Sequence, residues 1–220
     1  MDNHSVLFIE KFKDIKDLYA EVKEVIVLAE NFDNDNDVYL SPLTEIRNTL
    51  DHIMRSFSYP DKIHTEFDEA KEHLYRAGYD AYEVLAINVS SRMIKCIEKY
   101  SSQTISTIFP AYYTEIKQKI IDVKVEIGEI RAHKRLNPET GTKSFTPYKE
   151  KIIELLNCLK KCEQNIPDLE KEKRRRVGRD IINIIIGIAI AAAGIFVYEK
   201  FLKVKEKQPP TEITVPLNKG

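Results

Sequence analysis

The segment "IHTEFDEAKEHLYRAGYDAYEV", residues 63–84, decides the fold of this 220-residue chain. Its apolar side chains recur at alternating intervals of four and three residues, at Ile63, Phe67, Ala70, Leu74, Ala77, Ala81 and Val84. This spacing places them on one face of an α-helix. We therefore predict a long helix over residues 61–100, in which Gly78 costs about 1 kcal/mol relative to alanine.

Segments on both sides of this helix repeat the same apolar spacing. The further predicted helices cover residues 6–30, 41–57, 103–135 and 146–164. Ser41 suits the N-cap of the second of these helices, and Pro42 suits its first turn. Pro60 and Pro167 are expected to follow helix ends, and Pro110 to kink or start a helix. No segment shows the period of two that a strand requires, so we predict an all-α helical bundle with long helices.

The composition excludes several other classes of protein. A net charge of −1 provides no global basic field that would attract nucleic acid. Three cysteines, Cys96, Cys158 and Cys162, are too few for a disulfide framework in a chain of this length or for a four-ligand zinc site. We expect all three to be structural.

The predicted helix over residues 41–57 has two distinct faces. Its apolar residues, which we expect to face the core, are Leu43, Ile46, Leu50, Ile53, Met54 and Phe57. Asn48 and His52 lie almost opposite them, four residues apart and therefore neighbours on the helix surface. Arg47 lies at the border of the apolar face, and Asp51 lies between the directions of Arg47 and His52.

Arg47, Asn48 and His52 can together support RNA cleavage. An imidazole transfers protons at neutral pH, a guanidinium holds a phosphate, and an amide orients either group. Because the ribose 2′-hydroxyl is the nucleophile, no metal or other cofactor is expected. One helix carries half of such a site, so a facing second copy is expected to complete it. The alternative is a solvated helix surface with an Arg47–Asp51 ion pair worth under about 1 kcal/mol.

The pattern of Arg47, Asn48, three further residues and His52 resembles the signature of the HEPN superfamily. These are small α-helical ribonuclease domains of prokaryotic toxins and antiviral systems, which usually act as dimers with the signature at the interface. The resemblance implies that the three residues are catalytic. It covers the motif and the helical body to about residue 165, without the C-terminal segment. Pore-forming membrane accessory proteins of CRISPR systems are similar in architecture, which implies a second, non-enzymatic use of the motif as an interface.

A second polar group lies within the long central helix. His73, Arg76, Asp80 and Glu83 share roughly one face of it, beside three tyrosines. In the functional interpretation, His73, Arg76 and Asp80 join Asp51 in supporting the first motif, or line a ligand site at the helix pair. In the alternative interpretation, this is an ordinary helix surface with ion pairs at four-residue spacing.

The segment "IINIIIGIAIAAAGIFV" at residues 181–197 has no charged side chain. With its apolar flank it approaches the ~20 residues that a helix needs to span a bilayer. We predict a single-pass transmembrane helix over 181–202, a basic juxtamembrane segment over 166–180 and a polar tail over 203–220. More basic residues precede the span than follow it, which predicts that the N-terminal domain, residues 1–165, lies in the cytoplasm. The resemblance to prokaryotic proteins implies that the membrane is the inner membrane.

The basic residues Arg174, Arg175 and Arg176 are expected to bind anionic lipid headgroups, with RNA as the alternative ligand. Small residues such as Gly187 and Ala191 favour close approach of two spans. The expected partners are membrane lipids and further copies of this chain, as a dimer or higher homo-oligomer, with RNA and a CRISPR or other defence-system protein as candidates. Two main functions stay open: metal-independent RNA cleavage at a dimer interface by a HEPN-like antiviral effector, or a non-enzymatic membrane pore or membrane-disrupting oligomer. A third possibility is a subunit that tethers a cytosolic partner to the membrane.

Overall fold

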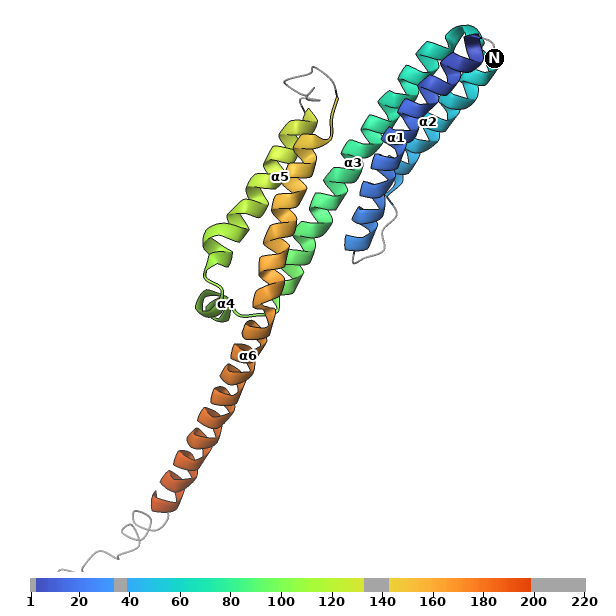
Figure 1. Ribbon diagram of the computed structural model, residues 1–220. Helices are drawn as coiled ribbons and strands as arrows, with labels where there is room; N and C mark the ends of the chain where they lie inside the picture. The colour runs from blue at the N-terminus through green and yellow to red at the C-terminus, as the bar shows by residue number, and fades with distance from the viewer. Residues whose placement is uncertain (1–2, 34–38, 133–142, 199–220) are drawn as a thin grey trace, which may run out of the picture. The chain divides into compact units, whose positions relative to one another are not determined.

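The computed structural model describes residues 3–33, 39–132 and 143–198 (Figure 1). These described residues are 94% helical and include no strand, which confirms the predicted all-α class. The helices are α1 (Asn3–Phe32), α2 (Leu40–Ser58), α3 (Ile63–Glu98), α4 (Ser102–Ile108), α5 (Lys117–Ala132) and α6 (Thr146–Val197). A 3-10 turn, η1 (Pro60–Lys62), precedes α3, and a π-helical turn, η2 (Tyr112–Ile116), precedes α5.

The chain forms two compact units, residues 1–169 and residues 170–220. Helix α3 is the central element of the first unit, because α1 and α2 both pack against it (Figure 1). A small core joins these three helices near the start of α3. Its buried residues are Ile15, Ile63, Phe67, Ala70 and Leu74. Ile53 of α2 packs against this core, so the predicted central helix does organise the bundle.

The second half of α3 belongs to a larger core that also contains residues of α1, α4, α5 and α6. Five rings within it, which we call the aromatic core, are Tyr75, Tyr79, Tyr82, Phe145 and Tyr148. The ring centroids of Tyr79 and Tyr148 are 5.3 Å apart. Burial raises the pKa of Tyr79 and Tyr82, which keeps both phenols neutral. Leu85, Val123 and Leu155 complete an apolar interior between α3, α5 and α6.

Gly78 lies where the aromatic core presses most closely on α3. A Cβ atom at this position would come within 2.2 Å of Cζ of Phe145. Phe145 is only 2% exposed, so its ring has little room to move aside. The absence of a side chain at Gly78 therefore lets Phe145 pack directly on α3, which offsets the intrinsic cost of a glycine within a helix.

Helix α2 packs against α3 with a face that is rotated by roughly 90° about the helix axis from the predicted one. Its buried residues are Pro42, Thr49 and Ser56, which are spaced seven residues apart. Four of the six predicted core residues are instead exposed: Leu43 by 47%, Leu50 by 56%, Met54 by 58% and Phe57 by 60%. The other two, Ile46 and Ile53, are partly buried and pack against the two cores, as predicted. The prediction for the four exposed residues was wrong because small hydroxyl residues let the two helices approach, and because the polar side chains of α2 find partners on α3.

One helix start in the first unit differs from prediction. Helix α2 begins at Leu40 without a side-chain cap, and the Ser41 hydroxyl donates a hydrogen bond to Asp80 of α3 instead. Pro110 lies between α4 and η2 and divides the helix predicted over residues 103–135, which agrees with the kink or helix start expected at this proline.

Helix α6 continues through Pro167, so the predicted helix end near Gln164 was wrong. A proline inside a helix costs about 3 kcal/mol, because it removes a hydrogen bond and crowds the preceding turn. Leu169, two residues beyond the proline, is fully buried in the larger core. Packing of that side chain stabilises the helical turn after Pro167.

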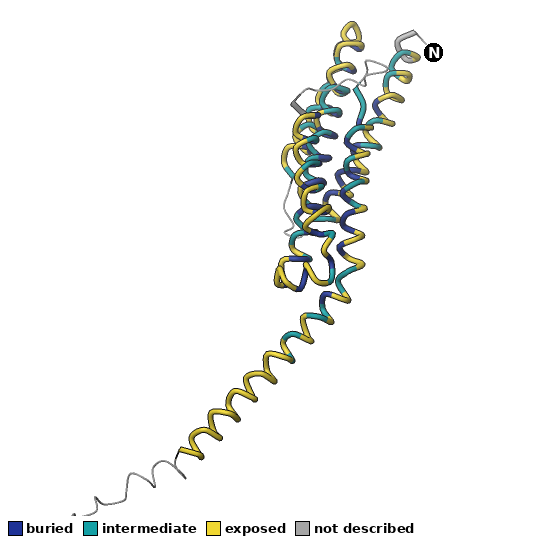
Figure 2. The backbone as a smooth tube through the Cα atoms, turned by 90° about the vertical axis from the view of Figure 1, so that its left-hand side faces the viewer, coloured by how far each residue is buried: buried dark blue, intermediate teal, exposed yellow. Residues whose placement is uncertain are grey.

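The described part of the second unit is the C-terminal portion of α6. Every residue from 179 to 198 is exposed (Figure 2). The most apolar 18 residues of this helix have a mean hydropathy of 2.4, and none of them is buried. By length and composition the helix can cross a membrane, as predicted. Residues 199–202 of the predicted span and the predicted tail over 203–220 lie outside the described residues.

Candidate functional site

The residues of the predicted RNA-cleaving motif face different sides of α2. Arg47 and Asp51 are exposed, whereas Asn48 and His52 are partly buried. The backbone carbonyl of Asp51 accepts a hydrogen bond from Nε of Arg55, at 3.3 Å. Within one chain the structure therefore brings His52 to the contact with α3, and leaves Arg47 and Asp51 on the solvent side.

His52 is held by a carboxylate from α3. Its Nδ1 lies 2.8 Å from Oε2 of Glu66, and the two side chains are only 14% and 13% exposed. Nε of Arg55 lies 4.0 Å from the same carboxylate oxygen. The His52 ring stacks on the ring of His73, with centroids 5.1 Å apart and an interplanar angle of 29°. Two imidazoles from different helices thus lie face to face.

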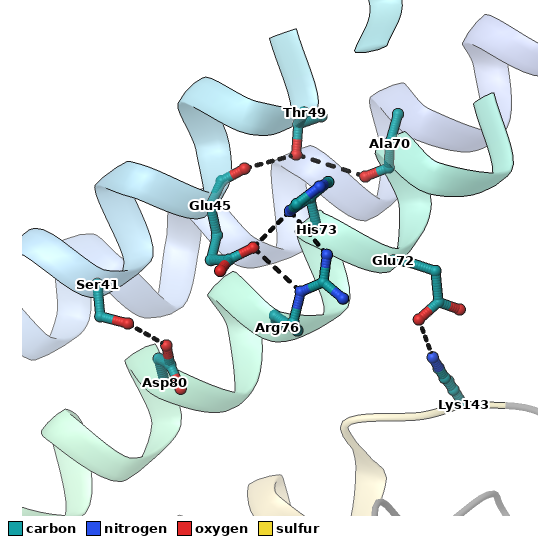
Figure 3. Close-up of polar contacts among 9 residues, drawn as sticks. All are labelled: Ser41, Glu45, Thr49, Ala70, Glu72, His73, Arg76, Asp80 and Lys143. Carbon is teal, nitrogen blue, oxygen red and sulfur yellow. Dashed lines mark hydrogen bonds and ion pairs between the residues drawn. The ribbon is translucent and has the colours of Figure 1, made fainter. Parts of the chain in front are cut away.

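A carboxylate from α2 holds the second imidazole (Figure 3). Oε2 of Glu45 lies 2.6 Å from Nδ1 of His73 and 3.1 Å from Nε of Arg76. Nη2 of Arg76 is also 2.8 Å from Nδ1 of His73, which can either donate to Glu45 or accept from Arg76. Burial alone would raise the pKa of Glu45, but the hydrogen bonds and charges of His73 and Arg76 outweigh burial and hold that pKa below its usual value.

We call these five side chains, Glu45, His52, Glu66, His73 and Arg76, the α2–α3 polar cluster. Thr49 sits within the same contact (Figure 3), where its hydroxyl lies 2.9 Å from the Glu45 carbonyl and 3.4 Å from the Ala70 carbonyl. The Ser56 hydroxyl donates to the carbonyl of Ile53, at 2.6 Å. Because the hydroxyls of Thr49 and Ser56 pair with backbone carbonyls, the helices can approach without leaving these polar groups unpaired.

The structure brings together two groups of predicted residues that are distant in sequence. His73 and Arg76 of the predicted supporting group lie beside His52, and Asp80 receives its hydrogen bond from Ser41 of α2. The roles of these residues stay predictions. Their juxtaposition provides two imidazoles, several carboxylates and a guanidinium in one place, which is a set capable of proton transfer and anion binding.

Glu69 adds a third potential metal ligand beside the two imidazoles. One ligand atom from each of His52, Glu69 and His73 lies within 4.8 Å of the others. Glu69 is exposed and precedes His73 by four residues, so both side chains project from the same side of α3. Imidazole nitrogens and carboxylate oxygens are the ligands that zinc and related divalent ions take in proteins.

Sequence reasoning missed Glu45, Glu66 and Glu69 as members of the site. The spacing on each helix could have indicated that these glutamates share a face with the histidines. Glu45 precedes His52 by seven residues, or two helical turns. Glu66 and Glu69 precede His73 by seven and four residues on α3. No spacing within one helix could show that these two polar faces meet each other.

The basic run before the predicted span is partly neutralised within its own helix. Oε1 of Glu172 lies 3.1 Å from Nε of Arg176 and 3.1 Å from Nη2 of Arg179. Arg174 and Arg175 are exposed. The predicted binding of lipid headgroups by this run stays a prediction.

The buried thiols form no part of this site. Cys162 is fully buried, and burial raises its pKa to about 12. Cys158, one turn earlier, is also buried, and its pKa is raised for the same reason. Neither thiol is therefore a ready nucleophile at neutral pH.

A scan of the chain against protein-family models finds no match, and searches of curated proteins and of solved structures find no significant similarity. The geometry of the α2–α3 polar cluster therefore carries the functional argument.

Proposed function

We propose that this chain is a membrane-anchored, HEPN-like effector of prokaryotic antiviral defence that cleaves RNA without a metal. The observation that supports this proposal is the stacked pair of imidazoles, His52 and His73, each with a carboxylate at Nδ1. In this proposal α6 anchors the chain in the inner membrane, and the N-terminal helices lie in the cytoplasm with access to RNA.

The two imidazoles have complementary roles in the proposed reaction. One accepts the proton of a ribose 2′-hydroxyl, whose oxygen attacks the adjacent phosphorus. The other gives a proton to the 5′-oxygen as the bond between that oxygen and phosphorus breaks. The products are a 2′,3′-cyclic phosphate and a 5′-hydroxyl end. Glu66 and Glu45 accept the Nδ1 protons, so Nε2 of each ring is left to exchange protons with RNA.

The guanidinium beside the imidazoles supplies the phosphate contact in this mechanism. Arg76 is 45% exposed and contacts the His73 ring through Nη2, so we assign it the phosphate contact of this mechanism. Arg47 and Asn48 contribute from a facing second copy, as the HEPN resemblance implies. In this mechanism a single chain holds the general acid and the general base. Dimerisation adds Arg47 of the second copy as a second guanidinium that binds the phosphate.

Cleavage of RNA by the full chain in detergent, with EDTA present, tests the proposal. We expect His52→Ala and His73→Ala each to lower the cleavage rate by about 10²–10⁴-fold, the usual contribution of a general acid or base. His64→Ala is the matched control, because His64 is also on α3 but is exposed. The product ends should carry 2′,3′-cyclic phosphates. Equal rates for the wild type and both variants, or no cleavage by the wild type, would refute this function.

A second candidate function, a non-enzymatic oligomer that perturbs the membrane, is favoured by the exposed side of α2. The residues that we call the apolar stripe are Leu40, Leu43, Leu50, Met54 and Phe57, all exposed. With Arg47 between Leu43 and Leu50, their spacing alternates three and four residues, as in the seam of a coiled coil. Such a stripe suits packing against the same stripe of another copy.

Ion leakage from cells that produce the full chain tests this second candidate. We expect the paired change Leu50→Glu and Met54→Glu to abolish leakage and oligomerisation. Val125→Glu should change neither, because Val125 is 56% exposed on α5, away from the stripe. Leakage that persists after removal of residues 181–202 would contradict a membrane pore.

A further inference from the structure

We propose that His52, Glu69 and His73 form a binding site for a divalent transition metal of the zinc type, which joins α2 to α3. One ligand atom from each residue already lies within 4.8 Å of the other two. A tetrahedral zinc ion with bonds of about 2.0–2.1 Å to nitrogen and oxygen holds its ligand atoms about 3.4 Å apart. To close around an ion, the three ligand atoms would have to approach one another by at most about 1.4 Å.

The carboxylates behind the two rings are the second argument for a metal. Histidines that bind metals in proteins almost always donate the N–H of the other ring nitrogen to a carboxylate, a carbonyl or water, which orients the ring. Here Nδ1 of His52 is 2.8 Å from Glu66, and Nδ1 of His73 is 2.6 Å from Glu45. Both rings therefore have Nε2 left for a metal, and both acceptors come from the helix opposite to the ring they orient.

A bound metal also resolves the double contact at His73. Binding through Nε2 uses the lone pair of that nitrogen, so the ring proton must reside on Nδ1. Nδ1 then donates to Glu45, and it no longer accepts from Arg76. Arg76 keeps its contact with Glu45 through Nε, at 3.1 Å. The metal thus selects one tautomer and one hydrogen-bond pattern.

The local charge favours a divalent cation. Glu45, Glu66 and Glu69 bring three carboxylates to this contact, against the two guanidinium groups of Arg55 and Arg76. With neutral imidazoles a net negative charge remains at this contact, and it attracts a cation. Two imidazoles and one carboxylate suit zinc and leave its fourth position open for water.

Metal binding is independent of the proposed RNA cleavage, but it involves the same atoms. An ion on Nε2 of His52 and His73 occupies the lone pairs that proton transfer needs. Zinc should therefore inhibit the metal-independent cleavage proposed above. Affinity for zinc can be measured whether or not the chain cleaves RNA, so the failure of one proposal is distinguishable from the failure of the other.

A calorimetric titration with Zn²⁺ tests the site. It uses the full chain in detergent after treatment with EDTA and dialysis. We expect one ion per chain and a thermal midpoint that rises with zinc. Glu69→Gln should weaken binding at least about 10-fold without disturbing the fold, because Glu69 is exposed. His52→Ala should abolish it. Glu66→Gln should weaken it by about 10–100-fold through loss of the orienting carboxylate.

The matched control is His64→Ala, which removes an exposed imidazole of α3 and should leave zinc affinity unchanged. Equal affinities of the wild type, Glu69→Gln and His52→Ala would overturn the proposal, as would a wild type that binds no zinc. Binding lost in Cys162→Ala but kept in His52→Ala would also overturn it, because the ion would then be held by thiols.

Discussion

The two sides of helix α3 are built in opposite ways. Toward α5 and α6, α3 contributes to the aromatic core and to a largely apolar interior. Toward α2, it meets small hydroxyl residues and a cluster of imidazoles, carboxylates and a guanidinium. Apolar burial stabilises a fold, whereas buried ion pairs contribute little net stability because desolvation offsets their attraction. We therefore expect the contact of α3 with α5 and α6 to contribute more to the stability of the bundle than the α2–α3 polar cluster does.

The largest expected effect comes from an apolar truncation in the larger core. Leu155→Ala removes a side chain with no exposed surface and should lower the free energy of unfolding by about 2–5 kcal/mol. Ile153→Ala is the matched control on the same helix, because Ile153 is 56% exposed, and it should cost far less. Chemical denaturation of the full chain in detergent measures both. Similar decreases in the free energy of unfolding for the two variants would show that packing in the larger core is not the main source of stability.

The next effect tests the close packing of Phe145 on α3. Gly78→Ala places a methyl group within 2.2 Å of Cζ of Phe145 and should lower the free energy of unfolding by about 1–3 kcal/mol through overpacking. Gly128→Ala on α5 meets nothing within 4 Å and should raise it by about 0.5–1 kcal/mol through helix propensity. In thermal unfolding, the midpoint temperature should fall for Gly78→Ala and rise for Gly128→Ala. A shift in the same direction for both would mean that Phe145 can move aside.

A smaller effect on stability is expected in the α2–α3 polar cluster. The paired change Glu45→Gln and His73→Gln removes the ion pair but keeps polar groups of similar size, and should change the free energy of unfolding by less than about 1 kcal/mol. The same variant should lose RNA cleavage and zinc binding. Denaturation and activity measured on one preparation separate these roles. A loss above about 2 kcal/mol would show that this contact stabilises the bundle as the aromatic core does.

The smallest effect concerns the ion pairs on the surface of α5 and α6. Hydrogen bonds from Lys119 and Lys151 lower the pKa of Glu154 below its usual value. A carboxyl with a lowered pKa contributes stability that is present above the unfolded-state pKa and is lost as pH falls through the folded-state pKa. Glu154→Gln should therefore lower stability slightly at pH 7 and flatten its decline below about pH 4.5. This linkage would be contradicted if the free energy of unfolding declined at low pH as steeply in Glu154→Gln as in the wild type.

Periodicity predicted most of the helices because it depends on local geometry alone. The three–four spacing from Ile63 to Val84 lies within α3, and residues 6–30 lie within α1. The uncharged segment at 181–197 lies within α6 and is exposed throughout. These features follow from the 3.6-residue helical repeat and from apolar length, so no knowledge of neighbouring elements was needed.

The tertiary structure decided which faces meet. Periodicity divided α2 into an apolar and a polar side, but α2 packs through the face between them, where Glu45 and His52 have partners on α3. Helix α6 continues past Pro167 because Leu169 is buried. The sequence by itself determined the all-α class, the positions of α1 and α3 and the apolar span. Only the packing of α2 on α3 determined the site, because its ligands and their partners come from segments whose proximity no local pattern encodes.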